Sequence, residues 1–313
     1  MPGSTVVTLT PNPAIDVSCD ADEIRPTHKI RTSNERLAPG GGGINVARVI
    51  QRLGCPVDAI FMAGGPTGEV LDSLLARQGL PRKWIRIARD TRMSLAVHER
   101  STGLEYRFVP EGPRVSAREL EEWLAAISDA RCAYLVASGS LPRGAADDLF
   151  ARSAAARYHD SRLVLDTSGP ALRSSLEAGG TFLVKPSRGE LERLAGRPLP
   201  TLDEVMNEAK RLVASGRAEH VAVTLGADGA LLVNKERAGF LPAIPLETRS
   251  AVGAGDSFLA GFVHGLATNL DVWEAFRLAT AAGAAAVLSP GADLCRPEDV
   301  RRLLQKVPTP EFR

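Results

Sequence analysis

The sequence predicts an α/β protein built on one mostly parallel central sheet that is flanked by helices. Short runs rich in apolar and β-branched residues alternate along the 313-residue chain with stretches of helical periodicity. Runs that are apolar throughout are typical of strands buried on both faces of a parallel sheet. The length allows two domains or one large α/β domain with an insertion, and the continuous alternation favours one domain over residues 1–313.

The apolar pattern gives each element an expected place. Up to residue 78 we expect strands at 6–9 and 59–63 and helices at 44–53 and 68–78. After residue 115 we expect helices at 116–127 and 145–158, strands at 133–137, 163–166, 182–185 and 220–224, a hairpin between 229 and 240, and helices near 256–267, 272–287 and 297–305. The proline-containing tail at 308–313 is expected to be frayed.

Two segments interrupt this alternation of strands and helices. Residues 17–38 and 93–109 have the pattern of extended, hairpin-like strands, and in the second segment Leu95, Val97, Tyr106 and Phe108 alternate around a turn. We expect the two segments to project together as a small β-strand lid inserted in the domain.

Composition excludes several classes of partner. The 38 basic and 37 acidic residues give a net charge of +1, which offers no electrostatic case for nucleic acid or an anionic membrane. No window approaches the roughly 18 apolar residues of a membrane span, and the N-terminus lacks the pattern of a secretory signal. The four cysteines are scattered and include no C-x-x-C pair, which favours a reducing, cytoplasmic location.

The segment Ser250-Ala-Val-Gly-Ala-Gly-Asp-Ser257, followed by an apolar run, predicts an anion site at the start of a buried helix. Gly253 and Gly255 allow a tight turn that brings backbone N–H groups toward a ligand. Asp256 would stand beside that anion as a proton acceptor. The alternative is that Asp256 only caps the helix, although Leu259 is not the Glu or Gln that would complete a capping box.

A second glycine turn, Pro39-Gly-Gly-Gly-Gly-Ile-Asn-Val-Ala47, also leads into a helix. Four consecutive glycines cost backbone entropy, and close approach of a sugar to the backbone accounts for them, with Asn45 as a hydrogen-bonding partner. The alternative is a flexible hinge.

Three charged residues are further candidates for ligand binding. Two prolines end the first expected strand and place Asp16 at the mouth of the sheet, where ligand sites lie in open α/β sheets. Lys29 and Arg92 fall in or beside the lid segments, and a phosphorylated substrate needs such cations. Each of the three is otherwise explained as a solvated surface charge.

Common catalytic motifs are absent from the sequence. It has no P-loop, no dinucleotide-binding fingerprint, no nucleophile elbow and no H-E-x-x-H, and its five histidines lack metal spacing. Phosphoryl transfer mainly needs positioning and charge neutralisation, so an amide-lined anion hole, a divalent metal with the nucleotide, and one aspartate could suffice.

The two glycine turns together resemble the paired signatures of the PfkB family of carbohydrate kinases, whose members have the ribokinase-like fold. Other segments fall in the family's order and extend the resemblance over essentially the whole chain, at 10–16, 91–92, 138–142, 166–169, 184–186 and 224–229. The resemblance implies an ATP-dependent kinase that needs Mg²⁺.

Within the family, Thr10-Pro-Asn-Pro-Ala-Ile-Asp16 resembles the branch that acts on phosphorylated ketohexoses. Relatives acting on fructose 1-phosphate or tagatose 6-phosphate commonly carry Gly-Gly-Lys-Gly, whereas Gly42 occupies the lysine position here, and 292–296 is also similar to the fructose 6-phosphate subgroup. The resemblance therefore implies phosphorylation of the 1-hydroxyl of fructose 6-phosphate. The alternatives are a kinase of the other two sugar phosphates, a nucleoside or ribose kinase, and a non-catalytic sensor, against which Asp256 argues.

The resemblance also implies roles for individual residues. Asp256 is the base, and the amides of Gly253, Ala254 and Gly255 stabilise the γ-phosphoryl group. The sugar hydroxyls are held by Asp16, Gly41, Gly42 and Asn45, and the 6-phosphate is bound by Lys29, Arg92, Arg107 and Ser140.

On the nucleotide side, Lys185, Glu190, Thr224, Gly226 and Gly229 are expected to frame the ATP phosphates, with Glu190 holding Mg²⁺ through water. The helix from Ala282 to Ala286 is expected to border adenine, and K⁺ is expected on carbonyls of Ser250, Val252, Ala286, Ser289 and Gly291. The family's Asn-x-x-Glu pattern is Ser187-Arg-Gly-Glu190 here, so a shorter hydroxyl replaces an amide among the nucleotide-binding residues. Glu190 is otherwise a favourable first-turn charge, and Lys185 a loop marker. A homodimer that pairs two lids is implied, because lid edges are usually covered.

Overall fold

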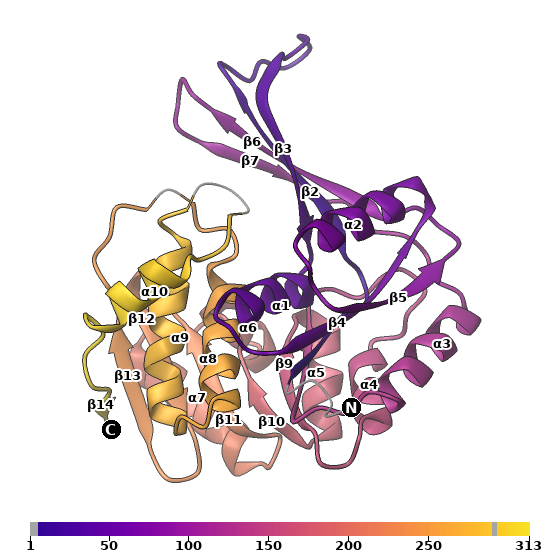
Figure 1. The fold of residues 1–313 in the computed structure, drawn as a ribbon. Coiled ribbons are helices and arrows are strands. Elements are labelled where there is room, and N and C mark those ends of the chain that lie inside the picture. The colour runs from indigo at the N-terminus through magenta and orange to yellow at the C-terminus, as the bar shows by residue number, and fades with distance from the viewer. Residues whose placement is uncertain (1–5, 249, 290–292) are drawn as a thin grey trace.

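The computed structural model describes residues 6–248, 250–289 and 293–313, and within them a ten-stranded sheet and a four-stranded sheet form the framework (Figure 1). The large sheet has the strand order β14-β13-β12-β11-β10-β9-β8-β1-β4-β5. Its parallel part consists of β1 (Val6–Thr10), β4 (Val57–Gly64), β5 (Arg82–Ile87), β8 (Tyr134–Ser138), β9 (Arg162–Asp166), β10 (Thr181–Val184) and β11 (Ala218–Thr224). Three antiparallel strands extend one edge: β12 (Gly229–Val233), β13 (Ala238–Pro242) and β14 (Glu311–Phe312).

Helices cover both faces of the large sheet, as the alternating pattern predicts. The core of one face is formed with α1 (Gly42–Arg52), α2 (Gly65–Arg77), α8 (Ala254–Ala267), α9 (Val272–Ala286) and α10 (Pro297–Leu304). The opposite core is formed with α3 (Ala117–Ser128), α4 (Leu149–Ala156), α5 (Gly169–Ala178), α6 (Arg188–Ala195) and α7 (Leu202–Ala214). None of the helices in the described part of the chain is both long and apolar enough to span a bilayer.

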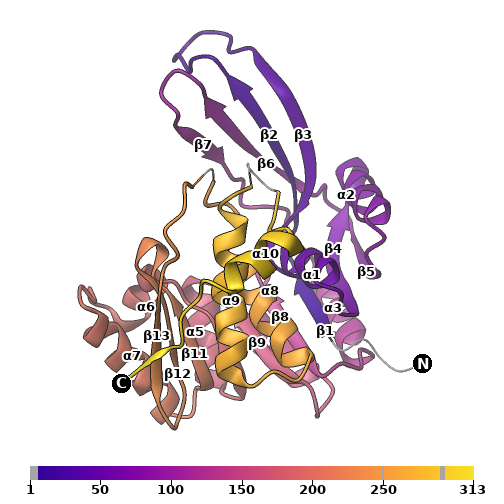
Figure 2. The same ribbon diagram turned by 60° about the vertical axis from the view of Figure 1, so that its left-hand side comes forward.

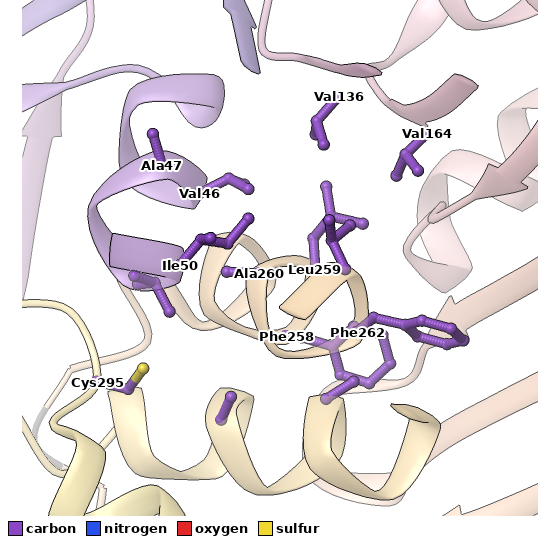
Figure 3. Close-up of a cluster of buried hydrophobic side chains, with 14 of the residues drawn as sticks. Val46, Ala47, Ile50, Val136, Val164, Phe258, Leu259, Ala260, Phe262 and Cys295 are labelled. Atoms are coloured by element: carbon purple, nitrogen blue, oxygen red, sulfur yellow. The ribbon is translucent and has the colours of Figure 1, made fainter. Parts of the chain in front are cut away.

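The packing of α1 against α8 brings the two glycine turns of the sequence to one place. Figure 3 shows Val46 and Ile50 of α1 beside Leu259 and Ala260 of α8, with Val136 of β8 above them. All five side chains are buried, so this contact lies in the core of the protein. Because each glycine turn leads directly into one of these helices, their packing fixes the distance between the turns.

The small sheet projects from the body of the molecule (Figures 1 and 2). Its strands are β2 (Ala14–Ala21), β3 (Thr32–Gly40), β6 (Arg92–Glu99) and β7 (Glu105–Phe108), in the order β3-β2-β6-β7. Each of the two expected segments forms an antiparallel hairpin, and a parallel pairing of β2 with β6 joins them.

Several elements differ from the prediction. The helix expected from residue 145 begins at Leu149, and β5, α5 and α7 were not expected. The tail is not frayed, because Phe312 pairs with Gly239 of β13 and its ring lies 4.9 Å from that of Trp273. The tail was wrongly predicted because β14 has only two residues, which are too few to show a periodic pattern, and it is ordered by its pairing with β13.

Candidate active site

A cleft with a volume of about 310 Å³ lies between the base of the small sheet and the carboxyl ends of the parallel strands. This is the edge at which open α/β sheets bind ligands. The cleft brings together most residues that the sequence predicted for the sugar and the transferred phosphate, namely Asp16, Gly41, Gly42, Asn45, Arg92, Arg107, Ser140, Gly253 and Asp256, and also Glu190 and Val252.

Asp256 lies in the first turn of α8, and its carboxylate faces the other glycine turn. The N-cap of α8 is Gly253, with φ of 73° and no side-chain hydrogen bond, so the alternative in which Asp256 only caps the helix is wrong. Asn45 Nδ2 donates to Asp256 Oδ2 over 2.8 Å, although the two residues are 211 positions apart.

The surroundings of Asp256 make its carboxylate more basic than an exposed one. Burial raises the pKa of Asp256 to about 6, the negative charge of Asp166 adds to this, and the hydrogen bond from Asn45 and the charge of Lys185 oppose it. A group with this pKa is ionised at neutral pH and can accept a proton from a hydroxyl.

A buried cation lies beside the start of α8. Lys185 Nζ is 3.0 Å from Asp166 Oδ1, and it is 3.5 Å from the position that a Cβ atom on Gly255 would occupy. Amide groups of a first helical turn have no partner within the helix, and the Ala254 N–H makes only a long 3.4 Å contact with the Ala251 carbonyl. This end of α8 therefore combines weakly engaged donors with a nearby positive charge. The arrangement suits a phosphoryl group that passes over Gly255.

The four-glycine turn is packed against the sheet, which contradicts the flexible-hinge alternative. A Cβ atom on Gly40 would overlap the Asp16 carboxylate, one on Gly42 would overlap Ser138 Oγ, and one on Gly43 would overlap the Leu9 carbonyl. Gly41 has φ of 108°, a conformation that favours glycine. The turn therefore needs glycine for packing and conformation, in addition to any approach by a ligand.

Arg92 and Ser140 form the end of the cleft nearest to the small sheet. The guanidinium of Arg92 donates to the carbonyls of Asn12 (2.9 Å) and Pro110 (2.8 Å) and more weakly to Ser140 Oγ (3.4 Å). Burial lowers the pKa of Arg92, and Asp16 opposes this change. Arg107 reaches the same cleft from β7, so two guanidinium groups border this end.

The cleft also contains residues that the sequence analysis did not assign to the site. These are Ala14, Ser94, Val109, Ser138, Gly139, Asp166, Thr167 and Ser168. Ser94 donates to the Asp16 carboxylate, while Ser138 and Asp166 stand at the ends of β8 and β9. Their position at strand ends is a usable indication of a site, and only the pairing of the strands brings them together.

Two predicted site residues lie elsewhere. Lys29 is exposed between β2 and β3 and does not line the cleft, so one chain alone does not bring it to the 6-phosphate. Ala282 is fully buried where α9 crosses Gly261 of α8, so its side chain does not border a ligand. Gly283 and Ala284 of the same helix are partly exposed, and Gly283 lies beside Ala254 and Phe258 of α8.

Ser187 and Glu190 form a reciprocal cap at the start of α6. Ser187 Oγ accepts from the Glu190 N–H over 3.3 Å, and the Glu190 carboxylate accepts from the Ser187 N–H over 2.8 Å. Glu190 lines the cleft, whereas Ser187 does not. Beside this cap the Thr224 N–H donates to the Pro186 carbonyl, and the following loop uses Gly226 and Gly229 at φ of 62° and 119°.

The predicted monovalent-cation loops lie next to one another. The Ser250 N–H donates to the Val287 carbonyl over 3.4 Å, and Ser250 and Ser289 are both buried. Gly291, also predicted for this site, lies outside the described residues. Across the described ranges, no three His, Cys, Asp or Glu side chains gather as metal ligands.

Comparison with known families identifies the chain, because the pattern of the pfkB family carbohydrate kinases matches residues 6–299. The chain belongs to the pfkB family. Among its relatives, the ATP-dependent 6-phosphofructokinase isozyme 2 of Mycobacterium tuberculosis is 42% identical over 97% of this chain and 90% of its own length. The Escherichia coli isozyme 2 is 40% identical over 95% and 97%.

Solved structures of pfkB family relatives agree with the fold. Three structures of Escherichia coli phosphofructokinase-2 superpose with TM-scores of 0.92 to 0.93 at 37% identity and cover 97% of this chain and 99% of theirs. They are a complex with fructose-6-phosphate, a complex with potassium, and a tetrameric inhibited form. A ribokinase from Thermotoga maritima has a TM-score of 0.77 at 21% identity. The predicted ribokinase-like fold is therefore confirmed.

Proposed function

We propose that this pfkB family member transfers the γ-phosphoryl group of ATP to the 1-hydroxyl of fructose 6-phosphate and forms fructose 1,6-bisphosphate. The observation that carries the proposal is the 2.8 Å hydrogen bond between Asn45 and Asp256, which joins the sugar turn to the phosphoryl turn inside one cleft. The names of the relatives at 40% and 42% identity support this choice of substrate.

In this proposal, different residues bind the 6-phosphate and the hydroxyls of the sugar. Arg92, Arg107 and Ser140 border one end of the cleft and would bind the 6-phosphate, for which two guanidinium groups are suited. Asp16, Asn45 and the amides of Gly41 and Gly42 border its middle and would hold the hydroxyls.

Asp256 is then next to the 1-hydroxyl and accepts its proton as the oxygen attacks the γ-phosphorus. Proton transfer to a positioned carboxylate contributes about 10²- to 10⁴-fold to the rate. The amides of Gly253, Ala254 and Gly255, with Lys185 nearby, stabilise charge on the transferred group.

The nucleotide would lie beyond Asp256, along the ends of β10 and β11. Glu190 fits a carboxylate that holds Mg²⁺ through water, because it lines the cleft while the Ser187 N–H fixes its orientation. When bound, Mg²⁺ neutralises charge on the β- and γ-phosphates. Lys185, Thr224, Gly226 and Gly229 would border the phosphates, and Ser187 would act through Glu190.

A K⁺ ion behind the anion hole is a further part of the proposal. The contact between Ser250 and Val287 brings the two predicted carbonyl loops together, and a relative has been solved with potassium. The carbonyls of Ser250, Val252, Ala286, Ser289 and Gly291 would supply the ligands. Replacement of K⁺ by Na⁺ in the assay is expected to lower kcat, and unchanged kinetics would remove this site from the proposal.

The substrate is tested by a coupled ATP-consumption screen over fructose 6-phosphate, tagatose 6-phosphate, fructose 1-phosphate and the unphosphorylated sugars. We expect the highest kcat/KM for fructose 6-phosphate. A higher kcat/KM for fructose 1-phosphate would identify the protein as a 1-phosphofructokinase instead. Binding of a sugar phosphate without turnover would indicate the non-catalytic sensor. Arg92→Gln provides a control, since it should raise the KM for phosphorylated sugars selectively.

We also propose a homodimer formed through the small sheet. Strand register places Leu37, Val17, Leu95 and Phe108 in one row across all four strands. Leu37 and Phe108 are 51% and 57% exposed. A continuous apolar row on a sheet is typical of a protein contact, and a second copy of this sheet would cover it.

A cytoplasmic location is the last part of the proposal. Cys19, Cys55, Cys132 and Cys295 are all free thiols, which supports a reducing compartment.

A further inference from the structure

Arg48 is a buried cation in α1 that the proposed reaction does not use. It is 3% exposed, and no carboxylate within the described ranges forms a salt bridge with it. Its guanidinium donates to the Pro39 carbonyl (2.8 Å), to Asn45 Oδ1 (3.2 Å) and to Gln78 Oε1 (2.9 Å). A buried charge that is held only by neutral oxygens is costly, so these contacts need an explanation beyond packing.

The contact between Arg48 and Asn45 determines which way the Asn45 amide faces. The two ends of an amide have nearly the same shape, and its orientation follows from its hydrogen-bond partners. Arginine is only a donor, so the end of Asn45 beside Arg48 must be the carbonyl oxygen. The NH₂ group then faces Asp256, as the 2.8 Å hydrogen bond shows.

We propose that Arg48 is a positioning residue, which acts through Asn45 to keep an N–H donor directed at the Asp256 carboxylate. This inference rests on the proposed role of Asp256 as the base. Arg48 lies one helical turn after Asn45 on α1, and its bond to the Pro39 carbonyl ties the same guanidinium to the start of the glycine turn.

The chemical consequence follows from what Asp256 must do. With the amide reversed, the Asn45 oxygen would face a carboxylate oxygen, and two acceptors repel unless the carboxyl is protonated. A protonated carboxyl cannot take the proton of the sugar hydroxyl. Arg48 therefore selects the orientation of Asn45 that is compatible with the ionised base.

The charged groups around Arg48, Asn45 and Asp256 define the expected effect on the pH profile. Asp256 faces Asp166 from β9, Lys185 after β10 and Asp16 from β2, while Arg48 also faces Arg52 of its own helix and Asp293. Loss of Arg48 removes a positive charge and the restraint on Asn45. Both changes disfavour the ionised carboxylate, so both raise the pH at which the base becomes active.

The experiment compares kcat/KM against pH for the wild type and for Arg48→Met, which keeps the length and helix propensity of the side chain. We expect a loss in kcat of about tenfold to a hundredfold, the range for groups that orient a functional residue. The acid limb of the profile should move to higher pH. Arg48→Lys retains a charge and a donor, and it should restore the limb toward its wild-type position.

Two control variants separate positioning from general destabilisation. Gln78→Ala removes the third contact of Arg48 but leaves Asn45 engaged, so its acid limb should stay in place. Arg82→Met breaks a partly buried ion pair with Asp72, far from the cleft, and should lower thermal stability without moving the limb.

A double-variant cycle with Asn45→Ala gives the decisive result. If Arg48 acts through Asn45, then Arg48→Met should have little further effect on kcat in the Asn45→Ala background. Multiplicative effects, or an unchanged acid limb in Arg48→Met, would overturn the inference. Failure of the proposed substrate is a separate outcome, because the wild type would then show no turnover of fructose 6-phosphate, and the cycle would be run on whichever sugar it phosphorylates.

Discussion

Asp256 combines a raised pKa with a fixed hydrogen bond from Asn45, and these two properties suit its carboxylate to the proposed role of base. Burial is the main cause of the raised pKa, and the nearby Asp166 adds to it. The pair thus links the local chemistry of one residue to the packing of α1 against α8.

Asp256→Asn is expected to lower kcat by about 10²- to 10⁴-fold, because the amide cannot accept the hydroxyl proton. Binding of fructose 6-phosphate should change little, since the neighbouring contacts remain. Steady-state kinetics together with calorimetric binding measure the two effects. Turnover close to that of the wild type would remove Asp256 as the base.

The same substitution is expected to stabilise the fold above pH 6. The pKa of Asp256 is about 6 in the folded protein and 3.8 as its ordinary value, so stability from this group is complete below pH 3.8 and is lost as the pH rises to 6. At pH 8 the free energy of unfolding of Asp256→Asn should therefore exceed that of the wild type by about 3 kcal/mol, and the difference should vanish near pH 4. An equal difference at both pH values would contradict the raised pKa.

At the scale of single elements, the glycine turn and the start of α1 form one packed unit on β1 and β8. Gly43 is buried against the Leu9 carbonyl, where a Cβ atom has no room. The need for glycine at this position comes from the backbone of the sheet, which cannot move without disturbing its strand pairing.

Gly43→Ala is expected to cost about 1 to 3 kcal/mol of unfolding free energy, the range for overpacking a core. Gly189→Ala in α6 is the matched control, since a Cβ atom there meets only Arg193 Nη1 at 3.6 Å. Urea unfolding should show the control unchanged or stabilised by up to about 1 kcal/mol. Equal stability of both variants would show that the turn can relax.

The cap of α6 gives another prediction at this scale. Ser187→Ala removes the hydroxyl that accepts from the Glu190 N–H and should cost about 1 kcal/mol of stability. It should also raise the KM for ATP, because the first turn of α6, which carries Glu190, loses one of its two capping hydrogen bonds. Ser187→Asn keeps a capping side chain, so its stability should match the wild type within a few tenths of a kcal/mol. An unchanged KM in Ser187→Ala would separate the cap from nucleotide binding.

At the scale of the whole molecule, the small sheet both closes the cleft and presents an apolar row. Asp16, Ser94 and Arg107 reach the cleft, whereas Val17 and Leu95, at alternate positions, belong to the opposite face. One sheet can therefore serve the substrate on one face and a second subunit on the other.

Phe108→Asp is expected to convert the proposed dimer to a monomer, because it would place a charge within the apolar row that the second subunit covers. Light scattering after size-exclusion chromatography measures the mass. Leu270→Asp, at another exposed apolar position remote from the small sheet, is the control and should leave the mass unchanged. A wild type that is monomeric at micromolar concentration would end the proposal.

Much of the fold follows from local patterns in the sequence. The buried strands β1, β8 and β11 and the amphipathic helix α3 are predictable because each has its own periodicity or apolar run. The edge strand β5 was missed because Arg82, Lys83 and Arg86 interrupt the apolar run by which the other strands of the large sheet were predicted. The short strand β14 exists only through pairing with β13.

The site shows the same division between local and tertiary information. The glycine turns and Asp256 were predictable, since their residue types impose a local backbone and a local charge. The exposure of Lys29 away from the cleft and the burial of Ala282 were not predictable, because they depend on how the small sheet projects and how α9 packs on α8. Arg48 gave no indication in the sequence, where it is one cation in an amphipathic helix.

The sequence by itself determined the α/β fold class, most of the buried strands, the two glycine turns and the candidate base. Only the tertiary structure decided that the two turns meet, that Asn45 directs its NH₂ group to Asp256, and that Arg48 donates to the oxygen of the same amide. The reason is physical: backbone conformation and periodicity are set by neighbouring residues, whereas hydrogen bonds between residues 211 positions apart depend on the packing of whole helices.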